Sequence, residues 1–244
     1  MATEIIRIVP LHPGAAVAAP PASAQLTYRG GPLLATVEVF TIFWGSAWQG
    51  AQARLVQQLN DFFRYVVSSP LLDQLAEYST AAVSIGQGSL AGTLTVAGSE
   101  PGRTISDAAI QNAILDWIAQ GTIRKTTSNS LYFVYLPPGV TADLGGQQSC
   151  SAFCGYHESF GPQVFYAVMP FPDCSGCLGG SATLDALTST SSHELCEAIT
   201  DPVPGQGWYD DANGEIGDIC AWQTRKLAGW TIQLEWSNRL NNCV

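Results

Sequence analysis

Three apolar stretches of the chain have the length and composition of buried β-strands. They are residues 36–44, 131–136 and 164–169. The first is almost continuously β-branched or aromatic, which is typical of a strand covered on both faces, so we expect it near the centre of a sheet. Residues 81–97 predict two weaker strands around the turn Gly86-Gln87-Gly88, which lacks the pattern of a dinucleotide site.

Two further stretches carry apolar residues at helical spacing, which predicts amphipathic helices packed on the sheet. The first follows a capping box of Ser46 and Gln49 and ends near residue 70. Its apolar stripe is Leu55, Leu59, Phe62, Phe63 and Val66. The second begins at Ser106 and ends at Gly121. Its apolar stripe is Ile110, Ile114, Trp117 and Ile118.

A third helix, from about residue 182 to residue 200, contains the most informative polar motif, His193-Glu194-x-x-Glu197. At about 100° per residue, His193 and Glu197 share one face of this helix. The opposite face is apolar and consists of Leu195, Ala198 and Ile199. We therefore expect one side to pack against the protein and the other to face a cleft, with Asp201-Pro202 ending the helix.

The order of these elements predicts an α+β fold with α/β-like order: a mixed twisted sheet, two packed helices, the motif helix and disulfide-stapled loops. No internal repeat or clean linker interrupts residues 26–244, which we expect to form a single domain. Residues 1–25 are rich in alanine and proline and predict an extended lead-in, with order beginning near Leu26.

Charge and hydropathy exclude several classes of partner. The chain has 10 basic and 20 acidic residues and a net charge of −10, which argues against nucleic acids and anionic membranes. No apolar run reaches the roughly 18 residues of a membrane span. An acidic, lysine-poor surface suits a secreted protein. The N-terminus lacks a signal-peptide pattern, so we expect any export signal to have been removed or to lie outside this chain.

The seven cysteines allow two interpretations. Cys150-x3-Cys154 and Cys174-x2-Cys177 predict either a closed four-thiolate zinc site or two local disulfides. Their neighbours are serine, glycine and aromatic residues, which favours disulfides. Cys220 and Cys243 are the other disulfide candidates. An odd count leaves one thiol, and Cys196, expected to be buried on the motif helix, is the candidate.

The motif helix suggests metal-assisted hydrolysis. In His-Glu-x-x-His helices two histidines bind zinc and the glutamate takes a proton from the water. Here Glu197 replaces the second histidine, and a carboxylate oxygen is an acceptable zinc ligand. We therefore expect His193 and Glu197 to bind the metal, with Glu194 as the general base. A polar helix face without any metal is the alternative.

The loop after the motif helix carries four carboxylates, so it is where a third ligand is expected. Glu215 and Asp218 are the candidates. The sequence Asp-x-Asn-Gly at residues 211–214 resembles part of a calcium loop, but the rest of that pattern is absent. Asp210 and Asp211 are interpreted as residues of a tight turn.

Two other residues are candidates for stabilising an oxyanion. His157 lies beside the cysteines, where it is either a structural hydrogen-bonding group or a ligand or transition-state donor. Tyr209 either polarises a substrate carbonyl or fills a hairpin. No Gly-x-Ser-x-Gly elbow is present, and Glu194 and Glu197 are too close on one helix to flank a sugar bond.

Residues 26–202 resemble the plant EXORDIUM, or phosphate-induced, proteins and their bacterial relatives. The resemblance is carried by Leu26–Leu34, Phe43-Trp44-Gly45, the helix that follows, Cys150-x3-Cys154-Gly155-x-His157 and Cys174-x2-Cys177. Plant members are extracellular and are linked to growth responses. The resemblance therefore implies export and supports disulfides.

The bacterial type looks like one with a Ser-His-Glu-x-x-Glu-Ala-x-Thr-Asp-Pro helix followed by Gly-Trp-Tyr-Asp and Glu-Ile-Gly-Asp. This sequence matches at His193, Glu194, Glu197, Thr200, Asp201, Asp210, Glu215 and Asp218. The arrangement is similar to zincin metallopeptidases, but no methionine follows the helix to form the Met-turn of metzincins. It implies a single zincin-like domain.

The sequence thus predicts a secreted, zinc-dependent metallopeptidase-like hydrolase that acts on a peptide or protein, with calcium as a second candidate metal. The alternative is a non-enzymatic extracellular binding or signalling protein with a structural metal or none. The sequence indicates neither the substrate nor the oligomeric state.

Overall fold

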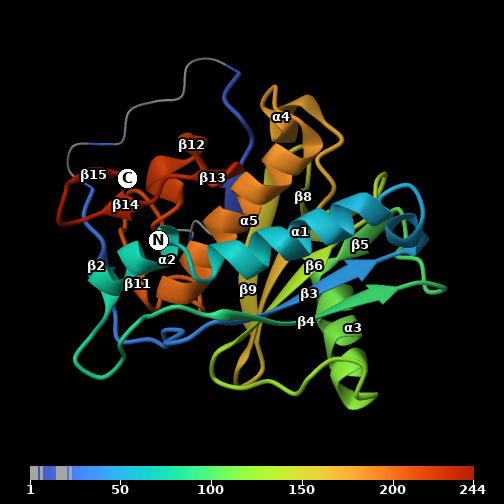
Figure 1. Ribbon diagram of the computed structural model, residues 1–244, viewed down its shortest axis with the longest axis horizontal. Coiled ribbons are helices and arrows are strands. Elements are labelled where there is room, and N and C mark those ends of the chain that lie inside the picture. The colour runs from blue at the N-terminus through green and yellow to red at the C-terminus, as the bar shows by residue number, and fades with distance from the viewer. Residues whose placement is uncertain (1–4, 6–7, 15–20, 22–23) are drawn as a thin grey trace.

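A computed structural model describes residues 5, 8–14, 21 and 24–244 and shows an α+β fold, as expected. Its centre is a six-stranded mixed sheet in the order β1-β9-β10-β6-β3-β4 (Figure 1). The strands are β1 (Ile8–Pro10), β9 (Phe153–Phe160), β10 (Val164–Met169), β6 (Ser130–Tyr135), β3 (Glu38–Trp44) and β4 (Ser89–Val96). Strands β10, β6, β3 and β4 are parallel, whereas β9 runs antiparallel to both β10 and β1.

Helices cover both faces of this sheet because successive strand residues point to opposite sides. In β3, Phe43 packs with α1 (Ala53–Val66), α2 (Pro70–Leu75) and α5 (Thr183–Thr200) on one face. Its neighbour Ile42 packs with α3 (Asp107–Ala119) on the other face. The two amphipathic helices and the motif helix of the sequence are therefore present, and together with the sheet they form three layers (Figure 1).

The C-terminal part of the chain returns over α5. It consists of β11 (Trp208–Tyr209), η3 (Asp218–Cys220), β12 (Thr224–Leu227), β13 (Trp230–Gln233), β14 (Trp236–Ser237) and β15 (Asn242–Cys243). Strand β13 packs on α5, which also packs on β9 and β10. The other short elements are β2 (Thr27–Tyr28), η1 (Ser46–Gln49), η2 (Ala76–Tyr78), β5 (Thr104–Ser106), β7 (Thr141–Leu144), β8 (Gln147–Gln148) and α4 (Ser175–Leu178).

Helix α5 is enclosed on every side. All of its residues from Ala186 to Thr200 are buried, polar and apolar alike. The expectation that its polar side faces a cleft is therefore wrong. The reason is tertiary, because the segment after residue 201 closes over the polar side of the helix.

Local predictions succeeded where a side chain acts on its own backbone. Ser106 caps α3 as expected, accepting a hydrogen bond from the Ala109 amide at 3.3 Å. The capping box at Ser46 is wrong, because residues 46–49 form the separate 3-10 helix η1 and α1 begins at Ala53. Residues 81–97 contain one strand, β4, instead of two.

Part of the N-terminal lead-in belongs to the fold. Residues 8–10 form β1, an edge strand that pairs with β9, and Val9 is buried. Order therefore begins earlier than Leu26, which corrects the expectation of a wholly extended lead-in; an edge position tolerates Pro10 because proline lacks an amide hydrogen. The rest of the lead-in, residues 1–4, 6–7, 15–20 and 22–23, lies outside the described residues.

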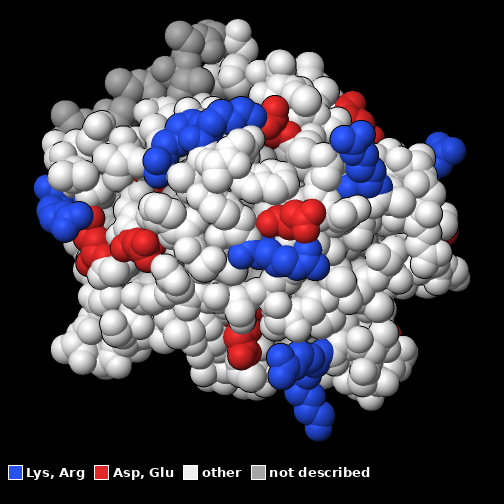
Figure 2. Space-filling model, viewed as in Figure 1, with Lys and Arg blue, Asp and Glu red and all other residues white. Residues whose placement is uncertain are grey.

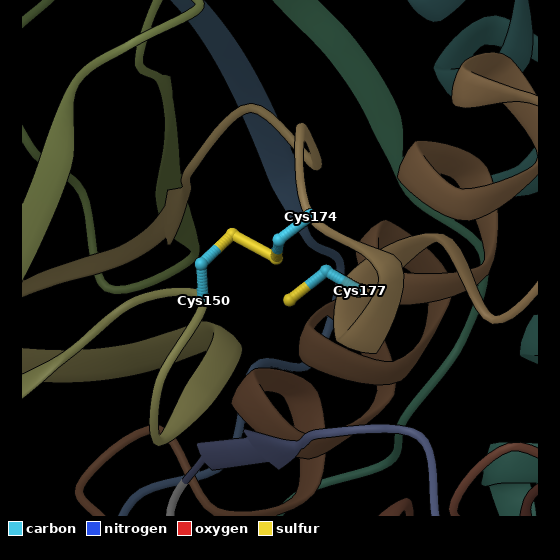
Figure 3. A group of neighbouring side chains, drawn as sticks. All are labelled: Cys150, Cys174 and Cys177. Atoms are coloured by element: carbon cyan, nitrogen blue, oxygen red, sulfur yellow. A yellow bond between two sulfur atoms is a disulfide. The ribbon is translucent and has the colours of Figure 1, made fainter. Parts of the chain in front are cut away.

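Three disulfides are present, as the composition around the cysteines favoured. They join Cys150 to Cys174, Cys154 to Cys177 and Cys220 to Cys243. The first two connect separate segments, so the expectation of local bridges within each pair is wrong. Figure 3 shows the Cys150–Cys174 bridge with Cys177 beside it. Cys154 lies on β9 and Cys177 on α4, so this bridge holds β9 to the segment that leads into α5.

The surface carries less of the acidity than the composition suggests. Five carboxyl side chains are completely buried: Glu194, Glu197, Asp201, Glu215 and Glu235. On the face in Figure 2, basic and acidic side chains are scattered among uncharged residues. Among the described residues, no helix is both long and apolar enough to cross a membrane.

Cys196 is the free cysteine, as predicted, and it is fully buried. Burial raises the pKa of its thiol well above the ordinary value, and the nearby Glu235 and Glu197 carboxylates act in the same direction. We expect the native protein to react with almost no Ellman reagent, and the unfolded, unreduced protein to react at about one thiol per chain, because only thiolate reacts. Several reactive thiols after unfolding would contradict the three bridges.

Candidate metal centre

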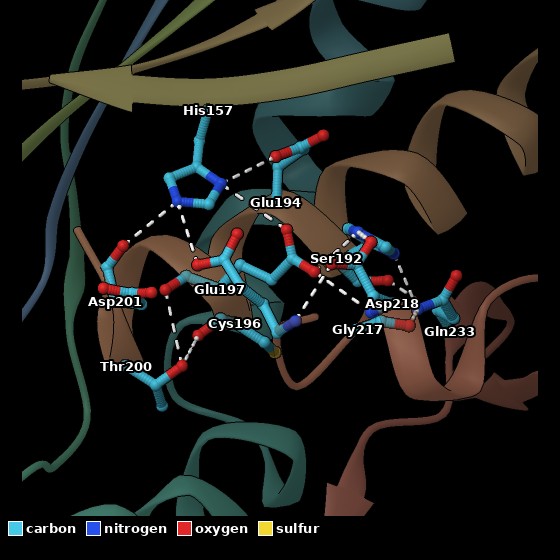
Figure 4. Close-up of polar contacts among 12 residues, drawn as sticks. His157, Ser192, Glu194, Cys196, Glu197, Thr200, Asp201, Gly217, Asp218 and Gln233 are labelled. Atoms are coloured by element: carbon cyan, nitrogen blue, oxygen red, sulfur yellow. Dashed lines mark hydrogen bonds and ion pairs between the residues drawn. The ribbon is translucent and has the colours of Figure 1, made fainter. Parts of the chain in front are cut away.

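Two histidines and four carboxylates meet between β9, α5 and the loop before η3. His157 comes from β9, and His193, Glu194 and Glu197 come from α5. Glu215 and Asp218 come from the returning segment. Figure 4 shows His157, Glu194, Glu197 and Asp218 of this group pointing toward one another. Five of the six are completely buried, and the Asp218 side chain is only 5% exposed.

His193, Glu197 and Asp218 form the first group with metal-ligand spacing. His193 Nε2 lies 2.8 Å from Glu197 Oε1 and 3.9 Å from Asp218 Oδ1. The Asp218 amide donates to Glu197 Oε1 at 3.1 Å, which fixes the loop against the helix. The sequence predicted His193 and Glu197 as ligands and left Glu215 and Asp218 as alternatives for the third. The fold brings Asp218 to the first two residues.

His157, Glu197 and Glu215 form a second such group. His157 Nδ1 lies 3.1 Å from Glu194 Oε2 and 3.5 Å from Glu197 Oε2. The other ring nitrogen, Nε2, lies 3.5 Å from Glu215 Oε1 and 3.1 Å from the Asp201 carbonyl oxygen. The two groups share Glu197, each through a different oxygen.

Two glycines allow the backbone to approach the cluster. A Cβ on Gly217 would lie 2.8 Å from His193 Nδ1 and 2.9 Å from Glu197 Oε1, so the loop can reach these side chains only with glycine there. A Cβ on Gly155 would lie 2.7 Å from Thr190 on α5. Glycine at this position of β9 therefore lets α5 pack closely enough for His157 to contact Glu194.

The Asp201 carboxylate holds the start of the returning segment. It accepts hydrogen bonds from the amides of Gly205, Gln206 and Gly207 at 2.6, 3.0 and 2.5 Å. These bonds turn the chain back immediately after α5 ends. The turn starts the path that carries Glu215 and Asp218 to the helix.

Several polar atoms of the cluster have no hydrogen-bond partner. In the described part of the chain, they are His193 Nε2, Glu194 Oε1, Glu197 Oε2, Asp218 Oδ1 and both carboxylate oxygens of Glu215. Buried polar atoms without a partner are costly, commonly by about 1–3 kcal/mol each and more when charged. Imidazole and carboxylate are also the donor groups that divalent metals bind, so the residues present fit a cation.

Gln233 determines which nitrogen of His193 carries the hydrogen. Its Oε1 accepts from the Trp222 amide at 3.1 Å, and its Nε2 donates to the Gly217 carbonyl at 2.9 Å. The same Nε2 lies 2.8 Å from His193 Nδ1, which must therefore accept. Metal binding through His193 Nε2 requires the hydrogen on Nδ1, so the Gln233 amide has to turn its oxygen toward the ring.

The cluster shifts the pKa values of its members. Burial acts to lower the pKa of His157, but the hydrogen-bonding carboxylates of Glu194 and Glu197 raise it well above the ordinary value. Burial, followed by the Glu197 charge, raises the pKa values of Glu215 and Asp218. Glu197 behaves in the opposite way: despite burial, the two histidines hold its pKa at about 2. Glu197 is thus the member that stays ionised.

The remaining predicted residues lie at the edge of this arrangement. The Tyr209 ring on β11 lies beneath the Arg29 guanidinium, 4.5 Å from its ring centre, and its role toward an oxyanion stays a prediction. Asp210 accepts from the Ala212 and Asn213 amides at 2.8 and 3.0 Å, which is the turn that was expected. Asp211 pairs with Arg29 at the surface.

Gln233 and Glu235 are not among the residues that the sequence predicted. Gln233 contacts His193 directly, and the fully buried Glu235 lies against the Cys196 thiol. Burial raises the pKa of Glu235 well above the ordinary value. No motif marks these positions, because their relevance comes from β13 packing on α5.

A search of known protein families found no model that matches this chain, and a search of curated proteins found no match. The resemblance to EXORDIUM proteins therefore stays a prediction, and the chemistry has to be inferred from the cluster itself.

The raised pKa values predict that the metal-free protein loses stability as the pH rises. The folded state binds more protons than the unfolded state at Glu215, Asp218 and His157, so the free energy of unfolding falls with increasing pH. The two carboxyl groups begin to destabilise the fold above about pH 4. The contribution of His157 is complete below about pH 6.5 and is lost above it.

In thermal unfolding experiments with EDTA, the Tm should fall as the pH rises from about 5 to about 8. Each kcal/mol lost from the free energy of unfolding should lower the Tm by roughly 2–4 °C. Added zinc should reduce the fall, because the cation replaces the protons. Glu158 follows His157 on β9 and points to the other face, so Glu158→Gln should keep the same slope. A Tm in EDTA that rises with pH would contradict the prediction.

Proposed function

We propose that this protein binds a divalent cation, with zinc preferred, through His193, Glu197 and Asp218. The observation that carries the proposal is the convergence of unpartnered, buried ligand atoms: His193 Nε2 and Asp218 Oδ1 lie 3.9 Å apart, with Glu197 Oε1 2.8 Å from the imidazole. These separations suit donor atoms arranged around one ion, since zinc binds nitrogen and oxygen at about 2.0–2.2 Å.

The donor set favours zinc over calcium. Calcium takes six to eight oxygen ligands and is rarely bound by imidazole. Each candidate group here contains one histidine nitrogen, which suits zinc and related transition metals. The partial calcium-loop pattern at residues 211–214 gives no support to calcium, because Asp210 and Asp211 are engaged in a turn and a surface ion pair.

The reaction that this set would serve is hydrolysis. Bound zinc supplies a Lewis acid that acidifies water and polarises a carbonyl. Glu194 follows His193 on α5, and its unpartnered Oε1 is the atom that would accept the proton. His157 holds the other oxygen of this carboxylate at 3.1 Å. The role of Glu194 is thus general base, and that of His157 is to position it.

The finer proposal is a secreted, zincin-like hydrolase that acts on a peptide or protein. It is supported by the His-Glu-x-x-Glu helix packed against a mixed sheet, and by three disulfides, which form and persist in oxidising compartments. The resemblance of residues 26–202 to EXORDIUM proteins points to the same location.

A structural cation is the second candidate function, and burial favours it. Structural zinc sites are closed, whereas catalytic sites keep one position open to substrate. Here the ligands are between 0% and 5% exposed, so a substrate could reach Glu194 only after the elements that enclose the cluster moved apart. In this case the cation would fix the segment 202–218 to α5 in a protein that binds or signals.

Replacing Glu194 with Gln separates the two functions. A hydrolase should lose about 10²–10⁴-fold in kcat/KM against a peptide library while keeping its zinc, because only the proton acceptor is removed. A structural site should show no hydrolysis in either protein, and a lower Tm after EDTA treatment of the wild type. Glu158→Gln is the matched control. Glu158 follows His157 on β9 and its side chain points to the other face of the sheet, so this change removes a carboxylate outside the cluster.

Zinc content measured on the purified protein tests the binding itself. His193→Ala should lower the bound zinc, whereas His12→Ala should not, because His12 packs against the Trp222 ring and belongs to neither candidate ligand group. Equal zinc content in both variants would contradict the proposed ligand set.

A further inference from the structure

We propose that the cluster holds two divalent cations, with Glu197 bridging them and His157 and Glu215 completing the second site. This inference rests on the proposed function, because the first cation is the one at His193 and Asp218. It makes the centre dinuclear and gives ligand roles to two residues outside the first group.

The orientation of Glu197 provides the bridge. Its Oε1 faces His193 Nε2 at 2.8 Å, and its Oε2 faces His157 Nδ1 at 3.5 Å (Figure 4). The carboxylate therefore presents one oxygen to each histidine. A carboxylate that binds one cation through each oxygen suits two ions about 3.5–4 Å apart, which is the spacing of two-metal hydrolytic sites.

The oxygens around His157 require a positive charge. Two face Nδ1, from Glu194 and Glu197, and two face Nε2, from Glu215 and the Asp201 carbonyl. A neutral imidazole has one N–H and one lone pair. Whichever nitrogen carries the hydrogen, the lone pair of the other faces two oxygen acceptors. Either a second proton or a cation removes this conflict.

The surroundings of Glu215 support a cation. Its carboxyl group is fully buried and lies against a second buried carboxyl group, that of Asp201, so one proton between them compensates only one of the two charges. A second proton on His157 leaves the surroundings of Glu215 unchanged. Nε2 lies closer to the Asp201 carbonyl oxygen, at 3.1 Å, than to Glu215 Oε1, at 3.5 Å, so an N–H there donates to Asp201. One ligand atom each of His157, Glu197 and Glu215 lies within 4.8 Å of the other two, so a cation bound to a single nitrogen of His157 gives the Glu215 carboxylate a partner.

The charges balance with two cations. Glu194, Glu197, Glu215 and Asp218 carry four negative charges when ionised, and the two histidines are neutral when they act as ligands. One divalent cation leaves two of these four charges uncompensated, and two leave none of the four. The buried Asp201 carboxylate is held separately by the amides of Gly205, Gln206 and Gly207, and the buried Glu235 lies outside this count. Buried charges without compensation are strongly disfavoured.

The two sites should fill in order. A cation at His193 requires the Gln233 amide to turn, which disrupts its bonds to Trp222 and Gly217. Within the described part of the chain no donor opposes a cation at His157, since the polar atoms around its ring are oxygen acceptors. We therefore expect the His157–Glu215 site to bind first and more tightly.

The test is zinc stoichiometry by isothermal titration and elemental analysis on the full chain, freed of metal with a chelator. The wild type should bind about two zinc ions in two steps, Asp218→Asn and Glu215→Gln about one each, and the control Glu158→Gln about two. Glu215→Gln should remove the tighter step. Far-UV circular dichroism identifies any variant that fails to fold.

A second measurement uses only the wild type. Loaded with Mn²⁺, it should give the exchange-coupled electron paramagnetic resonance spectrum of neighbouring ions, and the separate lines of isolated Mn²⁺ at full loading would overturn the bridge. One zinc per chain, lost in Asp218→Asn and kept in Glu215→Gln, also overturns the bridge but leaves the proposed function standing. One zinc with the reverse pattern overturns both the bridge and the first ligand set. No bound metal overturns both proposals.

Discussion

The burial of several carboxylates around two imidazoles is the constraint on which this structure depends. Glu194, Glu197 and Glu215 are fully removed from water, and charges in such surroundings need compensation by protons, hydrogen bonds or cations. In the metal-free chain, raised pKa values keep protons on Glu194 and Glu215, and backbone amides supply some of the hydrogen bonds. What remains unpartnered is a set of oxygen and nitrogen atoms with the spacing of metal ligands. The fold and the proposed chemistry therefore share one electrostatic cause.

Three separate connections bring the cluster together. The Cys154–Cys177 bridge holds β9, and with it His157, next to the segment that enters α5. The Asp201 carboxylate reverses the chain just after α5. The Cys220–Cys243 bridge then closes the returning segment beyond Asp218. The two disulfides lie outside the candidate ligands, whereas Asp201 also contacts the cluster through its carbonyl oxygen, 3.1 Å from His157 Nε2. The ligand side chains therefore do not hold these elements in place alone.

The same closure separates the two candidate functions. A hydrolase needs substrate to reach Glu194, and this carboxylate is completely buried against His157 and Gly155 of β9. A structural cation needs no access and gains from exclusion of water, because its interaction with carboxylates strengthens as the surroundings become less polar. Gln233 also affects metal binding. It favours the tautomer of His193 that carries its hydrogen on Nε2, the nitrogen that would bind the cation. Metal binding and the hydrogen-bond network of the metal-free state thus compete at this ring.

The sequence by itself determined the local elements. The apolar composition of residues 36–44 and 164–169 predicted strands, Ser106 predicted a helix start, and the spacing of His193 and Glu197 placed both on one helix face. These follow from interactions within a few residues. Only the tertiary structure decided that the polar face of α5 is closed, that the cysteines pair between segments, and that His157, Gln233 and Glu235 lie beside the motif. Such contacts depend on how distant segments pack, and no periodicity in the chain records that.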